Sequence, residues 1–163
     1  IVLGQTGLIT STAMVVSARE EASQIGVQIM QQGGNAFDAM VATELALAVA
    51  YPYAGNIAGG GFMVYRKANG DSGALDYREK APLKASKDMY LDKNKEVIPQ
   101  LSVNGAMAIG VPGTIAGVFA VHQKFGKLPL KTIMMPVIAL AKKGVVITEK
   151  QLKQINNSIH KVH

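Results

Sequence analysis

The fold is decided by residues 35–77, NAFDAMVATELALAVAYPYAGNIAGGGFMVYRKANGDSGALDY. Positions 36–50 are apolar on nearly every side, which is typical of a buried helix. Asn35 can cap the start of this helix, and Pro52 ends it. The three polar positions that interrupt the apolar run are Asp38, Thr43 and Glu44.

A β-hairpin follows this helix. Asn69-Gly70 is a strong hairpin signal, and it lies between two β-prone runs, so we expect antiparallel strands at 62–67 and 73–78. A lone hairpin is marginally stable in water, so these strands are expected to belong to a larger sheet. Arg78 falls where the second strand ends, a position from which a rigid element can aim a side chain into a cleft.

Further helices are predicted on both sides of this region. One covers 17–32, with Ser17 as N-cap and Glu20 at capping-box spacing. Another places Pro112 in its first turn and runs to about Phe125, and helical patterns also cover 130–143 and 149–160. The chain is therefore predicted to be α+β, mostly helices plus one hairpin.

The charge distribution argues against nucleic-acid binding. The 17 Lys and Arg exceed the 11 Asp and Glu by +6, but residues 124–163 alone carry eight Lys against the single acid Glu149. That segment has no Arg and only Phe125 among aromatics, whereas a base-stacking surface interleaves both. A solvated face, or one that meets an acidic surface, is favoured.

Several other classes of site are disfavoured by the sequence. The absence of Cys excludes a disulfide framework and any thiolate nucleophile or metal ligand. His122, His160 and His163 are scattered without metal-ligand spacing. The uncharged runs 45–65 and 101–123 contain Pro and several Gly, so we expect no membrane span. Because the first residue is Ile1 and no signal peptide follows, the natural N-terminus is expected to be missing.

The residues alone leave two interpretations of Arg78 open. Its planar fork suits a substrate carboxylate, but an ion pair with Asp76 or Glu79 is equally consistent with the pattern and more common at strand ends. The glycine-rich loop 54–61 follows a helix and opens a strand, the reverse of a phosphate loop, so a packing role is favoured over nucleotide binding. No complete catalytic constellation can be assembled.

Four motifs together resemble the N-terminal part of the large subunit of γ-glutamyltranspeptidases, bacterial rather than animal. They occur in that family's order and cover about residues 14–150. They are Gly33-Gly34-Asn35-Ala36-x-Asp38-Ala39, Pro52-x-Ala54-Gly55-Asn56-Ile57-x-Gly59-Gly60-Gly61-Phe62, Asp76-Tyr77-Arg78-Glu79-Lys80-Ala81-Pro82 and Gly110-Val111-Pro112-Gly113-Thr114-x-Ala116-Gly117.

The resemblance implies a partial αββα sandwich of the N-terminal nucleophile hydrolase type, made as a precursor that cleaves itself into large and small subunits. It implies that residues 1–163 are an incomplete N-terminal portion of the large subunit, whose partners are the rest of that subunit and the small subunit. The catalytic nucleophile is then a Thr at the start of the small subunit, so no catalytic residue is expected in this chain and the chain alone is expected to be inactive.

The resemblance also implies a function for the intact enzyme: transfer or hydrolysis of the γ-glutamyl group of glutathione-like γ-glutamyl amides. Arg78 is the one substrate-binding residue that it assigns here, to the α-carboxylate of the donor, and this favours the carboxylate clamp. No cofactor or metal is implied, and the expected location is periplasmic or secreted. The alternatives are a related cephalosporin acylase-type amidohydrolase and a non-catalytic domain whose basic end docks on an acidic partner.

Overall fold

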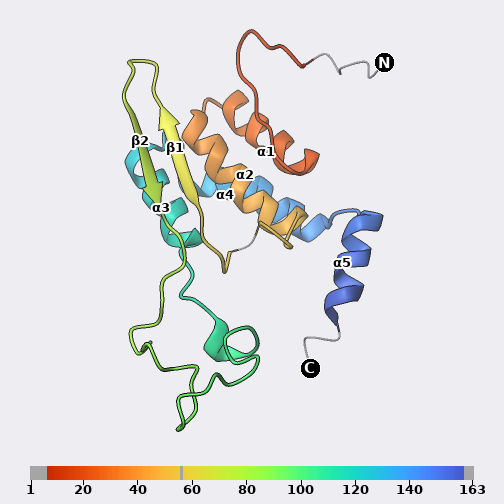
Figure 1. The fold of residues 1–163 in the computed structure, drawn as a ribbon. Helices are drawn as coiled ribbons and strands as arrows, with labels where there is room; N and C mark the ends of the chain where they lie inside the picture. Colours follow the sequence, from red (N-terminus) through yellow and green to blue (C-terminus); the bar gives the residue numbers. More distant parts are fainter. Residues whose placement is uncertain (1–6, 56, 160–163) are drawn as a thin grey trace, which may run out of the picture. The chain divides into compact units, whose positions relative to one another are not determined.

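The computed structural model describes residues 7–55 and 57–159 of the chain. It forms two compact units, Ile1–Asn56 with Val121–His163, and Ile57–Ala120. The first unit is helical and the second contains a two-stranded sheet (Figure 1). Among the helices of the described residues, none is long and apolar enough to cross a membrane.

Helix α2 (Ala36–Ala50) is the centre of the first unit and has the predicted bounds. Every residue of α2 after Ala36 is buried or half-buried, so the predicted buried helix is confirmed. Asn35 caps it: Oδ1 accepts hydrogen bonds from the backbone N–H groups of Phe37 and Asp38, both at 2.9 Å. The Asp38 carboxylate accepts in return from the Asn35 N–H at 3.0 Å, which completes a capping box.

Helices α1 (Glu20–Gln31) and α4 (Leu130–Lys143) both pack against α2. Helix α1 packs closely on α2 at Gly26, where an added Cβ would overlap the Thr43 hydroxyl oxygen. A side chain at this position would therefore push the two helices apart. The buried apolar core of this unit includes Ala22, Ile25, Ile29, Val41, Ala42, Ala46, Val121, Ile133 and Val137.

The predicted start of α1 is wrong. The N-cap is Arg19, which makes no side-chain cap hydrogen bond, and Ser17 lies outside the helix. The Ser17 hydroxyl bonds instead to the Arg19 carbonyl at 2.7 Å and to the Ser23 hydroxyl at 2.8 Å. Arg19 is held in this position by long-range contacts of its guanidinium, described below, which local capping signals do not include.

The second unit contains strands β1 (Phe62–Arg66) and β2 (Ser72–Asp76), paired antiparallel with Phe62 opposite Asp76. The hairpin is confirmed, but both strands end earlier than predicted. Lys67 closes the turn by donating its N–H to the Asp71 carbonyl at 2.7 Å. At the other end the Arg78 N–H turns back to the Asp76 carboxylate at 2.9 Å, so the chain leaves the sheet there. Membership in a larger sheet stays a prediction.

Residues between β2 and α3 (Thr114–Phe125) are mostly irregular, with one 3₁₀ turn, η1 (Ala106–Ala108). The helix predicted to include Pro112 begins later, at Thr114. Val111 is held in an extended backbone pair with Lys80, and the N–H groups of Gly113 and Thr114 both donate to the Gly59 carbonyl. The helix therefore starts at Thr114, two residues after Pro112. The last helix, α5 (Glu149–Ile159), belongs to the first unit.

Candidate functional site

Arg78 lies two residues beyond the end of β2, and its side chain is exposed. Within the described residues its guanidinium has no ion pair or hydrogen bond, and the neighbouring Asp76 carboxylate accepts the backbone N–H of Arg78. The alternative in which Arg78 is neutralised by Asp76 or Glu79 is therefore absent from this structure. A guanidinium with all its donors unused can bind an anion from outside.

Arg78 lies at a cavity of about 320 Å³ within the second unit. One wall is the end of β2 and the residues that follow it, and the other is the start of α3. Lys80 adds a second cation to the lining, so two positive side chains and one carboxylate, Asp76, border the same space. The composition suits a small anionic or zwitterionic group.

The glycine-rich loop before β1 packs against the backbone that carries Arg78. A Cβ at Gly60 would lie 2.7 Å from the Arg78 Cα and 2.7 Å from the Glu79 nitrogen, distances that real Cβ atoms do not reach. The Gly59 carbonyl accepts hydrogen bonds from the N–H groups of Gly113 at 2.8 Å and Thr114 at 3.0 Å. The packing role predicted for this loop is confirmed. Asn56, in the same motif, lies outside the described residues.

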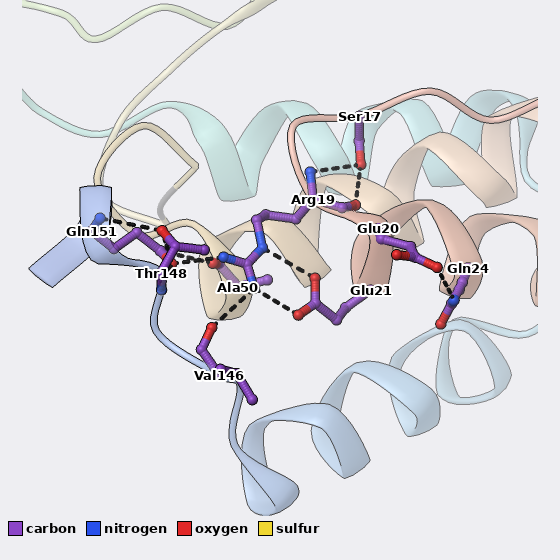
Figure 2. Close-up of polar contacts among 9 residues, drawn as sticks. All are labelled: Ser17, Arg19, Glu20, Glu21, Gln24, Ala50, Val146, Thr148 and Gln151. Atoms are coloured by element: carbon purple, nitrogen blue, oxygen red, sulfur yellow. Dashed lines mark hydrogen bonds and ion pairs between the residues drawn. The ribbon is translucent and has the colours of Figure 1, made fainter.

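The best-connected cation in the first unit is Arg19 (Figure 2). Its guanidinium donates to the Glu21 carboxylate at 2.6 and 3.1 Å, to the Gln151 side-chain carbonyl at 2.6 Å and to the Val146 carbonyl at 3.1 Å. Gln151 in turn donates to the Ala50 carbonyl at 2.9 Å, which ties α5 to the end of α2. Since four of its five N–H donors are occupied, Arg19 is structural, and no sequence spacing links residues 19 and 151.

The Arg19–Glu21 contact changes the pKa values of both groups. The hydrogen bond from Arg19 lowers the pKa of the Glu21 carboxyl, and the same bond raises the pKa of Arg19. Both changes favour the charged forms. They stabilise the start of α1 and leave no free charge for a ligand.

A second cavity, of about 380 Å³, lies in the first unit between α2 and the segment that precedes α1. Burial raises the pKa of the Glu44 carboxyl, which lies in this cavity. Three methionines line this cavity, Met14, Met30 and Met40. Apart from Glu44, no charged residue lines it, so it offers less for a charged ligand than the cavity at Arg78.

No group of three potential metal ligands comes together among the described residues. His122 bonds through Nε2 to the Leu128 carbonyl at 2.8 Å and thereby fixes the turn between α3 and α4. His160 and His163 lie outside the described residues. The described lysines of residues 124–163 are exposed, and Lys124 lies 5.2 Å from the centroid of the Phe125 ring.

Comparisons with known proteins agree on one family. The family model described as "Gamma-glutamyltranspeptidase" matches residues 22–163. A "Glutathione hydrolase proenzyme" of Pseudomonas sp. (strain A14) is 49% identical over 136 residues, which cover 83% of this chain and 24% of the relative. An "Acylase ACY 1 proenzyme" of Pseudomonas sp. (strain V22) is 40% identical over 144 residues, which cover 85% of this chain and 26% of the relative.

Solved structures give the same result. The crystal structure of Helicobacter pylori gamma-glutamyltranspeptidase matches with a TM-score of 0.90 at 46% identity, over 96% of this chain and 45% of that chain. The predicted fold class, an α+β portion of the N-terminal nucleophile hydrolase type, is thereby confirmed. The chain spans about a quarter of the length of the curated relatives. The sequence motifs, the family model and the backbone geometry lead to the same result: the chain belongs to the gamma-glutamyltranspeptidase family.

Proposed function

We propose that this chain forms part of a γ-glutamyltransferase or glutathione hydrolase that acts on glutathione-like γ-glutamyl amides, and that Arg78 binds the α-carboxylate of the donor. The observation that carries the proposal is the unpaired, exposed guanidinium of Arg78 beside a cavity of about 320 Å³. A bidentate Arg–carboxylate contact supplies both orientation and charge-assisted hydrogen bonds. Relatives that bear the name glutathione hydrolase support the substrate class.

The proposal assigns the bond-breaking step to residues outside this chain. In the intact enzyme a Thr at the N-terminus of the small subunit attacks the γ-carbonyl carbon, and the amine leaves with the proton taken from the Thr hydroxyl. Water or an acceptor amine then attacks the γ-glutamyl ester and restores the Thr. Residues 1–163 serve as an N-terminal portion of the large subunit, and we place the enzyme in the periplasm or outside the cell.

Exposed apolar side chains support the existence of further packed sequence. On one face of the hairpin Phe62 is 64% exposed and Val64 is 84% exposed, although both alternate with inward residues such as Met63 at 7%. A sheet face of this kind is ordinarily covered in a complete fold. The remainder of the large subunit and the small subunit are the proposed cover.

The role of Arg78 is tested by Arg78→Gln in the full-length, matured enzyme. Loss of a charge-assisted contact of about 1.5–3 kcal/mol raises the KM for a γ-glutamyl anilide by roughly 10- to 150-fold. The matched control is Arg66→Gln, an exposed Arg at the other end of the hairpin, which should leave KM unchanged. A 4-aminobutanoyl anilide lacks the α-carboxylate, so both Arg78→Gln and the wild type should turn it over equally poorly. Equal KM values for the γ-glutamyl anilide would refute the clamp.

A second candidate is an acylase of the cephalosporin type, which the similarity to the ACY 1 proenzyme and to the Bacillus halodurans cephalosporin acylase supports. A glutaryl anilide keeps the carboxylate that Arg78 would bind but lacks the α-amino group. The proposed enzyme prefers the γ-glutamyl over the glutaryl anilide, and the acylase has the opposite preference. Comparing kcat/KM for the two anilides separates the candidates.

A further inference from the structure

The residue before Arg78, Tyr77, is packed far more tightly than Arg78 itself. Tyr77 is 9% exposed. A Cβ at Gly61 would lie 2.8 Å from Cε2 of the Tyr77 ring, and a Cβ at Gly117 would overlap the ring at Cγ. The ring therefore occupies the space that side chains at these two glycines would need.

The backbone of Tyr77 is enclosed as well. Its N–H donates to the Gly61 carbonyl at 3.0 Å, and a Cβ at Gly113 would overlap its carbonyl oxygen. On the far side of Arg78, the Lys80 N–H and carbonyl are both bonded to Val111, at 3.1 and 2.8 Å. The backbone just before and just after Arg78 is therefore held in place, whereas the Arg78 side chain is exposed.

These glycines are required for space and not for backbone conformation. Gly61, Gly113 and Gly117 are absent from the glycines with positive φ, so an alanine could adopt their backbone angles. Gly117 also lies inside α3, where glycine lowers helix stability compared with alanine. Contact with Tyr77 gives the physical reason for a glycine there.

We infer that Tyr77 is a positioning residue for Arg78, and that a seat formed by Gly61, Gly113 and Gly117 sets the position of the guanidinium and hence the affinity for a carboxylate-bearing donor. The inference rests on the proposed role of Arg78 in donor binding. A side chain added to the seat displaces the Tyr77 ring and carries the adjacent Arg78 Cα with it. Displacements of about 1 Å at a binding group weaken binding and reaction by up to about 100-fold.

The test uses Gly117→Ala in the full-length, matured enzyme, alone and combined with Arg78→Gln. We expect Gly117→Ala to raise the KM for a γ-glutamyl anilide by about tenfold with less than about a twofold change in kcat. In the Arg78→Gln background it should add less than about twofold, because its effect passes through Arg78. Ile115→Ala, a change in the same helix at a side chain 36% exposed, is the control and should leave KM unchanged.

A second variant covers the case in which Gly117→Ala does not mature. Tyr77→Leu removes the ring from the seat and introduces no clash. It should raise the KM for the γ-glutamyl anilide when Arg78 is present and leave it unchanged in the Arg78→Gln background. A KM increase of equal size with and without Arg78 would overturn the positioning role and leave the Arg78 clamp intact. If Arg78→Gln itself leaves KM unchanged, the clamp and the positioning role both fail, so the two failures are distinguishable.

Discussion

Replacing Asp38 with Ala should strongly destabilise the first unit. Asp38 is fully buried, and its carboxylate accepts hydrogen bonds from three backbone N–H groups. One is Asn35 at 3.0 Å, in the capping box of α2. The others are Lys127 at 3.0 Å and Leu128 at 3.3 Å, in the turn between α3 and α4. One side chain therefore joins the start of α2 to a turn about 90 residues later in the sequence.

The expected loss follows from these three donors. Each buried N–H left without a partner costs about 1–3 kcal/mol, and water can reach a turn in part, so the low end of the range applies. We expect Asp38→Ala to lower the free energy of unfolding by about 3 kcal/mol. Asp38→Asn keeps one carbonyl oxygen as acceptor and should cost about half as much.

Urea unfolding followed by circular dichroism measures the loss, and amide hydrogen exchange localises it to Lys127 and Leu128. The control is Asp88→Ala, which removes the same charge from an exposed loop and should change stability by less than about 0.5 kcal/mol. If Asp38→Ala costs under about 1 kcal/mol, or if exchange at Lys127 is unchanged, then the carboxylate does not hold the turn.

Two further predictions concern pH. Burial raises the pKa of Glu44, so the charged form of this side chain lowers the stability of the fold. Glu44→Gln should therefore stabilise the protein at pH 7, and this gain should disappear below about pH 4.3, where Glu44 is protonated in both the folded and the unfolded state. Thermal unfolding at a series of pH values measures the difference. The Arg19 hydrogen bond lowers the pKa of Glu21, so its contribution is present above about pH 4.3 and is lost as the pH falls through the lowered value. Glu21→Gln should therefore reduce the loss of stability that the protein shows as the pH falls below about 4.3, by at most about 1 kcal/mol because the Glu21 side chain is 32% exposed. If the variant and the wild type lose the same stability over this pH range, the Arg19–Glu21 pairing is contradicted.

Local signals were sufficient to predict the helices whose ends depend on nearby residues. The bounds of α2 follow from Asn35 and Pro52, and the predicted bounds of α4 are the observed ones. The starts of α1 and α3 were wrong for a common reason. Residues distant in the sequence contact these segments: Gln151 contacts Arg19, and Lys80 pairs with Val111. These contacts keep the backbone extended at the positions where local capping signals predict the start of a helix.

The position of Arg78 was predictable, but its availability was not. A strand that ends near a charged cluster is visible in the sequence, whereas the choice between an ion pair and a free guanidinium depends on where the folded chain places the Asp76 and Glu79 carboxylates. In the structure this carboxylate is used by the backbone N–H of Arg78, at 2.9 Å. Within the described residues, neither this carboxylate nor that of Glu79 forms an ion pair with the guanidinium.

The motifs that carry the family resemblance divide between two structural tasks. Asp38 and Asn35 of the first motif fix the turn between α3 and α4, and the contacts that do so lie within the first unit. Glycines of the second and fourth motifs enclose the third, which contains Arg78, and these contacts lie within the second unit. In the sequence, glycines of this kind resemble turn signals or a phosphate loop, because the atoms that would clash with a side chain at these positions are up to 40 residues away. Their common partner is the short segment Tyr77-Arg78-Glu79, so the substrate-binding proposal depends on the packing of these glycines.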